Sequence, residues 1–343
     1  QQQKKLVASY QQRSIKLVSL NEARQHKLAL DWSANPVGPP EFLGPHVLPD
    51  IELAEVIPYI DWSPFFLSWE LKGKYPAILD DPRFGSAARE LFANAQQLLE
   101  TIQTEKRLAA RAVYGFWPAA SDGDDIVLFR DESRRHELAR IHTLRQQWQR
   151  RGQSEFRALA DYIAPLESDR SDHLGAFAVT SGIGADELAR EFEKDHDEYN
   201  AILVKALADR LAEALAEMLH QRARRDWGFG RQERFGHEEL IAESYQGIRP
   251  APGYPAQPDH TEKRTLFDLL DVEASLQMEL TESFAMLPAA SVCGWYFAHP
   301  QARYFAIDRI DRVQVADYAR RKGITTSDAE RWLAPNLAYE PDV

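Results

Sequence analysis

Apolar side chains recur every three or four residues along several stretches of the chain, which is the period of a helix with one buried face. Residues 86–107 show this spacing, with Ser86 placed to cap the first turn. A longer stretch runs from Asp186 to about Arg225, with an expected bend or break near residues 195–200. The same reasoning predicts shorter helices over residues 132–151, 263–271, 312–322 and 327–333.

Short runs rich in Val, Ile, Phe and Tyr, bounded by Gly, Pro or Asp, predict β-strands. They cover residues 111–117, 125–130, 174–179, 280–286, 291–297 and 303–308. The last two are expected to form a hairpin through His299-Pro300. Because strands and helices come without regular alternation, the expected fold class is α+β: a single large domain with a mostly antiparallel, twisted β-sheet flanked by helices.

Two segments near the N-terminus differ from this pattern. Residues 1–20 are polar and typical of an interdomain linker, so the domain itself is expected to span residues 21–343. Residues 32–49 contain five prolines and two glycines, a density that excludes helix and favours extended backbone. We expect this second segment to lie as an extended arm over the domain.

Charge and cysteine content narrow the functional classes. The net charge of −12 argues against nucleic acid as a partner, because duplex binding depends on Lys and Arg at the phosphates. Six arginines between residues 134 and 151 leave open a local basic face for an acidic partner. The single cysteine, Cys293, excludes an internal disulfide and points to a reducing compartment, the cytoplasm. No apolar stretch has the length of a membrane span, so no membrane partner is expected.

Sequence signatures of metal and nucleotide sites are missing. The histidines show neither HExxH nor any paired spacing, so no metal site is predicted. Neither GxGxxG nor GxxxxGK[ST] occurs, and Gly182-Ile183-Gly184 is too short a fragment to count. Any cofactor or substrate must therefore be recognised in another way.

The segment from Arg249 to His260 places four prolines in twelve residues. Such backbone is stiff and extended, and its remaining N–H and C=O groups project in fixed directions. That property suits main-chain recognition of a flat polar ligand. Composition alone leaves open the alternative of a plain connecting loop.

The same segment carries a resemblance to a known family. Tyr245 to Ile248, followed by RPAPGYPAxPDHTEK, is similar to the activation domain of cobalamin-dependent methionine synthases. The similarity continues downstream through TESFAM, SVCGWYFAHP, DYARRKG and ERWLAPNL, and upstream through YIDWSPFF, GKYPAIL and VKALADRLAEALAE. It covers the chain from about Leu17 to Tyr339. Gln257 stands where the family commonly has Cys, so no thiol role applies at that position.

The resemblance implies a site for S-adenosylmethionine (AdoMet). Its members are Asp61, Arg249, Ala251, Gly253, Tyr254, Tyr304 and Phe305, with Glu213 and Glu243 as further acidic candidates. AdoMet has a carboxylate, an ammonium, a sulfonium and an adenine, so its site needs a cation, carboxylates and aromatic faces. Arg249 would pair with the carboxylate and Asp61 with the ammonium, while main chain at Ala251 and Gly253 would meet the adenine. No catalytic residue is implied.

Three carboxylates, Asp209, Glu213 and Glu217, share one face of the long predicted helix. Like charges at this spacing destabilise a helix by about 0.2–0.5 kcal/mol per pair. One explanation is a solvated face relieved by Arg210 and His220. The other is that this face lines the cleft, with Glu213 near AdoMet and Asp209 at the surface that meets a cobalamin domain. Asp61 similarly has the alternative role of capping a turn.

The function that the resemblance implies is reactivation of a methyltransferase. The domain would bind AdoMet so that inactive cob(II)alamin is remethylated, with an electron from a flavodoxin-type donor. The chain lacks a DxHxxG cobalamin-ligand motif, so the cobalamin is expected in another domain of the full-length protein. Without homocysteine and folate modules, this chain alone would not make methionine. An AdoMet-sensing or adaptor module without methyl transfer is the alternative, and a self-sufficient methyltransferase is disfavoured by the missing glycine-rich loop.

Overall fold

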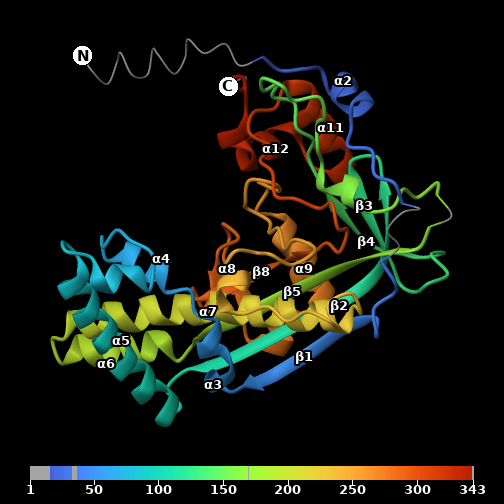
Figure 1. Cartoon of the computed structure of the whole chain (residues 1–343). Coiled ribbons are helices and arrows are strands. Elements are labelled where there is room, and N and C mark those ends of the chain that lie inside the picture. Colours follow the sequence, from blue (N-terminus) through green and yellow to red (C-terminus); the bar gives the residue numbers. More distant parts are fainter. Residues whose placement is uncertain (1–15, 33–36, 169, 342–343) are drawn as a thin grey trace, which may run out of the picture.

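The computed structural model describes residues 16–32, 37–168 and 170–341. Its centre is an antiparallel sheet with strand order β4-β3-β2-β5-β8, in which β1 pairs with the first half of β2 (Figure 1). The strands are β1 Gly44–Ile51, β2 Ala109–Asp122, β3 Asp125–Phe129, β4 Glu137–His142, β5 Asp172–Ile183 and β8 Ser291–Tyr296. Helices flank this sheet, so the predicted α+β class is confirmed.

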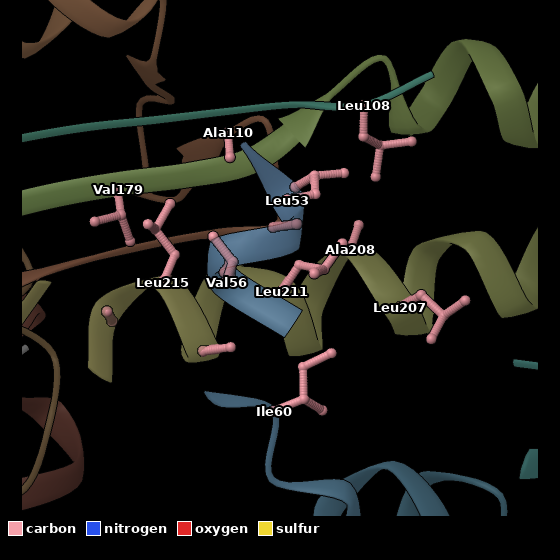
Figure 2. Packing of buried hydrophobic residues seen from close by; sticks show 14 of the residues in the cluster. Leu53, Val56, Ile60, Leu108, Ala110, Val179, Leu207, Ala208, Leu211 and Leu215 are labelled. Carbon is pink, nitrogen blue, oxygen red and sulfur yellow. The ribbon is translucent and has the colours of Figure 1, made fainter. Parts of the chain in front are cut away.

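The two long central strands, β2 and β5, are buried along most of their length. Helix α7, Glu198–Asp226, covers one face, and α9, Glu262–Leu270, with α10, Val272–Leu276, covers the other. Since both faces are covered, the strands show continuous apolar runs rather than alternation. Figure 2 shows Leu211 and Leu215 of α7 packed near Val56 of the short helix α3, Leu53–Val56.

The remaining helices lie around the ends of the sheet, except α8, which lies beside α7 (Figure 1). They are α2 Leu20–Gln25, α4 Trp62–Ser68, α5 Gly85–Thr104, α6 Ala185–Lys194, α8 His237–Ile241, α11 Arg312–Lys322 and α12 Thr326–Trp332. Helices α4, α5 and α6 gather at one end of the long strands, and α11 and α12 lie near α2 and the β3–β4 hairpin (Figure 1). An ion pair of 2.6 Å between Arg24 and Asp317 connects α2 with α11.

The long helical pattern after residue 185 is interrupted where the sequence predicted it. Helix α6 ends at Lys194 and α7 begins at Glu198. The Asp197 side chain caps α7 by accepting a hydrogen bond from the Asn200 N–H at 3.0 Å. Asp195–Asn200 was therefore correctly identified as a break. Helix α5 matches the predicted range less closely, because it begins at Gly85, and Ser86 is not its cap.

The arginine-rich stretch of residues 132–151 is not a helix as predicted. Residues Glu137–His142 form β4, which pairs with β3. Beyond the strand, Arg145 is only 1% exposed and binds Asp124 and Asp161. Neither partner is a helix neighbour, so tertiary pairing overrides the local pattern.

The arginines of this stretch do not form a common basic face. Arg140 pairs with Asp122 at 2.8 Å, and Arg150 pairs with Asp308. Together with Arg145, three of the six arginines are therefore paired with carboxylates within the fold.

The C-terminal strand predictions were partly wrong. Residues 303–308 form no strand, so the expected hairpin through His299-Pro300 does not exist. The outer edge of β8 is instead bonded by the segment at Ile248–Pro250: Ile248 and Phe297 exchange N–H···O bonds of 3.0 Å, and the Trp295 N–H donates to Pro250 O at 2.9 Å. The predicted strand at 280–286 is split into β6, Glu279–Leu280, and β7, Met286–Leu287, which pair with each other.

The proline-rich arm is extended from Gly44 onward, where it belongs to the central sheet rather than lying over the domain, while Trp32 lies in a turn and Glu41 in a bend. Strand β1, Gly44–Ile51, begins inside the arm and ends two residues after it. Residues 33–36 of the arm lie outside the described part of the chain. The same is true of residues 1–15 of the expected linker, so the proposed domain boundaries stay a prediction. Among the described residues, no helix is long and apolar enough to cross a membrane.

Candidate functional site

A cleft of about 300 Å³ lies between α4, α7, α8 and the segment that follows α8. Its lining residues are Tyr59, Asp61, Pro64, Arg210, Glu213, Ala214, Glu217, Leu240, Ile241, Glu243 and Arg249. Four of the residues predicted from the sequence, Asp61, Glu213, Glu243 and Arg249, are therefore brought together from separate parts of the chain.

Arg249 is placed by the backbone that borders β8. Gly247 has a φ of +91°, and a side chain there would meet the carbonyl oxygen of Phe297, so glycine is required at this turn. The antiparallel bridge between Ile248 and Phe297 then fixes the chain. As a result, the Arg249 side chain reaches the polar face of α7.

The side chain of Arg249 is bonded through one nitrogen. Nη1 lies 2.7 Å from Glu217 Oε2, 2.5 Å from the Tyr245 hydroxyl and 3.2 Å from His220 Nδ1. Within the described residues, Nε and Nη2 make no hydrogen bond, and the side chain is 17% exposed. Although burial lowers it, the Glu217 carboxylate raises the pKa of Arg249 above its ordinary value. The guanidinium thus keeps one edge for a ligand that accepts two hydrogen bonds.

Asp61 combines the two roles considered for it. Its Oδ1 accepts a hydrogen bond of 2.9 Å from the Ser63 N–H, so it caps α4. The same residue also lines the cleft. Nearby, the Tyr59 hydroxyl donates to Gln221 Oε1 at 2.7 Å, which connects this wall to α7.

The cleft has an excess of negative charge. Four carboxylates, those of Asp61, Glu213, Glu217 and Glu243, face two guanidiniums, those of Arg210 and Arg249. Burial raises the pKa of Glu243, and the nearby Arg249 opposes that rise. This balance suits a ligand with a net positive charge that also has one anionic group for Arg249.

The carboxylate stripe of α7 divides into three environments. Glu217 is buried against Arg249, Glu213 lines the cleft, and Asp209 is exposed outside it. One Glu217 oxygen, Oε1, is buried and has no partner among the described residues. The cleft explanation therefore fits Glu213 and Glu217, and the exposure of Asp209 fits either a solvated face or a surface that meets another domain.

Ala251, Gly253 and Tyr254 line a second hollow of about 420 Å³. Gly253 has a φ of +92°, and a Cβ there would lie 2.4 Å from the His260 ring. The turn is closed by the Gly253 N–H, which donates to Gln257 O at 2.7 Å. Tyr254 is 58% exposed and its ring is available to a ligand. Burial raises the pKa of Tyr254, and the negative charge of Glu213 raises it further.

Tyr304 and Phe305 have different positions. The Tyr304 hydroxyl accepts a hydrogen bond of 3.0 Å from the Arg249 backbone N–H, so it contacts the segment that carries Arg249. Phe305 instead packs toward the core, with its ring 6.3 Å from that of Tyr162. Neither Tyr304 nor Phe305 is among the lining residues of the two hollows.

Gln257 has a structural role in this chain. It is 2% exposed, and its Oε1 accepts a hydrogen bond of 2.8 Å from Trp295 Nε1. Gln257 therefore ties the proline-rich segment to β8.

Several groups around Arg249 were not among the predicted site residues. They are Tyr59, Arg210, Glu217, His220 and Tyr245. Glu217 could have been included from its spacing with Glu213. Tyr245 and His220 gave no such signal, because their contacts with Arg249 depend on how the segment is placed against α7. Over the described residues, no group of three or more His, Cys, Asp or Glu could hold a metal ion.

Two comparisons with known proteins bear on this geometry. Residues 52–323 match the family model described as vitamin B12 dependent methionine synthase, activation domain. Among solved structures, the chain is similar to the crystal structure of the MetH reactivation domain bound to AdoHcy, with 51% sequence identity and a TM-score of 0.92. The match covers 94% of this chain and 99% of the other.

Proposed function

Since the chain belongs to the family of activation domains of vitamin B12-dependent methionine synthases, we propose that it binds AdoMet in the Arg249 cleft to support remethylation of cobalamin. Cobalamin itself belongs to another domain of the full-length enzyme. As an activation domain, the chain is part of a methyltransferase. The similar MetH reactivation domain was crystallised with AdoHcy, the demethylated form of this ligand.

The observation that carries this proposal is the unused edge of Arg249. A guanidinium held at Nη1 presents Nε and Nη2 side by side, which is the geometry for a bidentate bond to a carboxylate. In AdoMet that group is the α-carboxylate. Asp61, across the same cleft, is the partner for the α-ammonium.

The excess of carboxylates fits the sulfonium. AdoMet supplies an electrophilic methyl group on a positively charged sulfur, and reduced cobalamin supplies the nucleophile. Glu213 lies where it offsets part of that charge, but it is exposed rather than buried. Because the positive charge on sulfur decreases on the way to the transition state, a strong ion pair would slow transfer. A solvated carboxylate holds the ligand with less of that penalty.

The chain contributes position rather than acid–base chemistry. Tyr254 is exposed at the second hollow, and main chain at Ala251 and Gly253 is available to the adenine. Holding the donor methyl in line with its acceptor removes much of the entropic barrier to the reaction. We therefore assign no general acid or base.

The partners follow from this role. We propose that the cleft face docks against the cobalamin-binding domain of the same chain, and that a flavodoxin-type protein delivers the electron. The exposed Asp209, one turn from Glu213 on α7, is our candidate for the cobalamin-domain surface.

Isothermal titration calorimetry of this chain with AdoMet tests the proposal, with AdoHcy as the matched ligand that lacks the positive charge. We expect saturable one-to-one binding of both, and tighter binding of AdoMet because of the acidic cleft. Absence of heat and of thermal stabilisation at millimolar ligand would contradict AdoMet binding by the isolated domain. Binding without support of remethylation, when the cobalamin-bearing enzyme is assayed with a reductant, would favour a sensing or adaptor module.

A further inference from the structure

A buried polar layer lies beneath the cleft and surrounds the anchored end of Arg249. Tyr245 and His220 are buried, and both contact Nη1 of Arg249. We propose that Tyr245 and His220 are positioning residues, which hold Arg249 by Nη1 and thereby give the cleft its preference for a ligand with an α-carboxylate. This inference rests on the proposed function, because it concerns how the same cleft selects its ligand.

The hydrogen-bond donors and acceptors at Nη1 define one arrangement. Nη1 has two hydrogens, and three acceptors surround it: Glu217 Oε2, the Tyr245 oxygen and His220 Nδ1. The Tyr245 hydroxyl donates its own hydrogen to Glu217 Oε2 at 3.2 Å, so its lone pair is free to accept from Arg249. The anchored end is therefore saturated, and a further acceptor must approach at Nε and Nη2.

His220 can take part only as a neutral acceptor. Burial, together with the charges of Arg224 and Arg249, lowers the pKa of His220 well below its ordinary value. A neutral ring that accepts at Nδ1 must have its proton on Nε2. A ring with the proton on Nδ1 would instead direct a donor at Arg249. The contact therefore requires the tautomer with the proton on Nε2.

The two rings are themselves held in place. His220 is stacked on Tyr296 with ring centroids 4.8 Å apart and planes 4° apart, and Tyr245 meets its edge at 4.9 Å. On its other side, Tyr245 is covered by the Arg224 guanidinium, 3.8 Å from the ring centroid, and Arg224 Nε contacts both carboxylate oxygens of Glu233 at 2.9–3.0 Å. An arginine held by such fixed groups loses little further freedom when a ligand binds.

The test compares two ligands that differ in the α-carboxylate alone, AdoMet and decarboxylated AdoMet. Their dissociation constants are measured for wild type, Tyr245→Phe and His220→Leu. Tyr245→Phe keeps the ring against Arg224 and removes the hydroxyl; His220→Leu removes the acceptor. We expect each substitution to weaken AdoMet binding by about tenfold. Binding of decarboxylated AdoMet should change by less than roughly twofold.

A conservative variant separates positioning from structural support. His220→Asn retains an acceptor oxygen on the same side chain, so we expect it to recover part of the AdoMet affinity that His220→Leu loses. Equal weakening of both ligands by Tyr245→Phe and His220→Leu, or no change in either, would overturn the inference. If wild type binds neither ligand, the proposed function itself fails. Should Tyr245→Phe not fold, the Leu and Asn variants of His220 still decide the question.

Discussion

Arg145, which is buried, and Arg249, whose side chain is 17% exposed, have opposite relations to their surroundings. Every nitrogen of the Arg145 guanidinium is used: Nε binds Asp124 at 2.7 Å, Nη1 binds Phe156 O at 2.7 Å, and Nη2 binds Asp161 at 2.8 Å. Arg249 is bonded through Nη1 and its other edge is open to the cleft. A saturated guanidinium supports the fold, whereas a half-saturated one is prepared for a ligand.

The strongest test of this comparison is Arg145→Met. Removing the cation leaves Asp124 and Asp161 buried without their main partner, and breaking a buried pair in this way costs about 3–5 kcal/mol. Urea unfolding should show that loss in the free energy of unfolding, and the folded fraction should still bind AdoMet with the wild-type dissociation constant. A large change in that constant would show that the two sites are coupled.

Arg249→Met should have the reverse effect. Losing charge-assisted hydrogen bonds to the ligand carboxylate should weaken AdoMet binding by about 10- to 100-fold. The midpoint of unfolding should change less than for Arg145→Met, since one end of Arg249 alone is engaged. Arg222→Met is the matched control, because Arg222 is on α7, the helix that Arg249 reaches, but does not line the cleft. Wild-type affinity in Arg249→Met would remove this residue from the site.

Asp61 combines the role of Arg145 in stability with the role of Arg249 in ligand binding, because it both caps α4 and lines the cleft. Asn is as good a cap as Asp, so Asp61→Asn should keep stability near wild type, whereas Asp61→Ala should lose about 0.5–2 kcal/mol. Both variants remove the charge that faces the ligand ammonium and should weaken AdoMet binding to a similar degree. If Asn restores full affinity, capping is the whole role of Asp61.

The smallest expected effect is a difference in pH dependence. His220 faces Arg224, Arg249, Tyr245 and Tyr296, and burial lowers its pKa below the ordinary 6.5. Because its folded-state pKa is depressed, the neutral ring stabilises the protein above about pH 6.5, and that contribution is lost as the pH falls below this value. The free energy of unfolding decreases by at most about 1.4 kcal/mol for each pH unit below that value.

This contribution is measured by unfolding wild type and His220→Asn between pH 7.5 and 5.5. The range covers about one unit on either side of the ordinary histidine pKa. The free-energy difference between the two proteins should decrease as the pH falls. A constant difference would mean that His220 does not change its proton affinity on folding.

The sequence predicted elements whose signals are local. Helix α11, Arg312–Lys322, has the predicted bounds, and Asp197 marks the start of α7 by its own hydrogen bond. β4 was missed because its pairing with β3 and the burial of Arg145 depend on residues outside any local window. The strand predicted at 303–308 failed for the same reason, since the edge of β8 was already bonded by Ile248–Pro250.

The candidate site shows the same limit. The resemblance, rather than any periodicity, named Asp61 and Arg249, and the fold brings them into one cleft. Pattern alone could pair Glu213 with Glu217, one helical turn apart. No pattern could show that Tyr245 and His220 meet at one nitrogen of Arg249, because that contact depends on the placement of the segment against α7. The residue roles within the site stay predictions.

The proline-rich segment that borders β8 also affects the solubility of the sheet. A free edge strand exposes unpaired N–H and C=O groups and can pair with another chain, which starts aggregation. Here Ile248–Pro250 bonds that edge, and prolines at 250, 252 and 255 have no N–H with which to extend the ladder outward. The segment that presents Arg249 to a ligand therefore also ends the sheet on this side and keeps the edge of β8 from pairing with another chain.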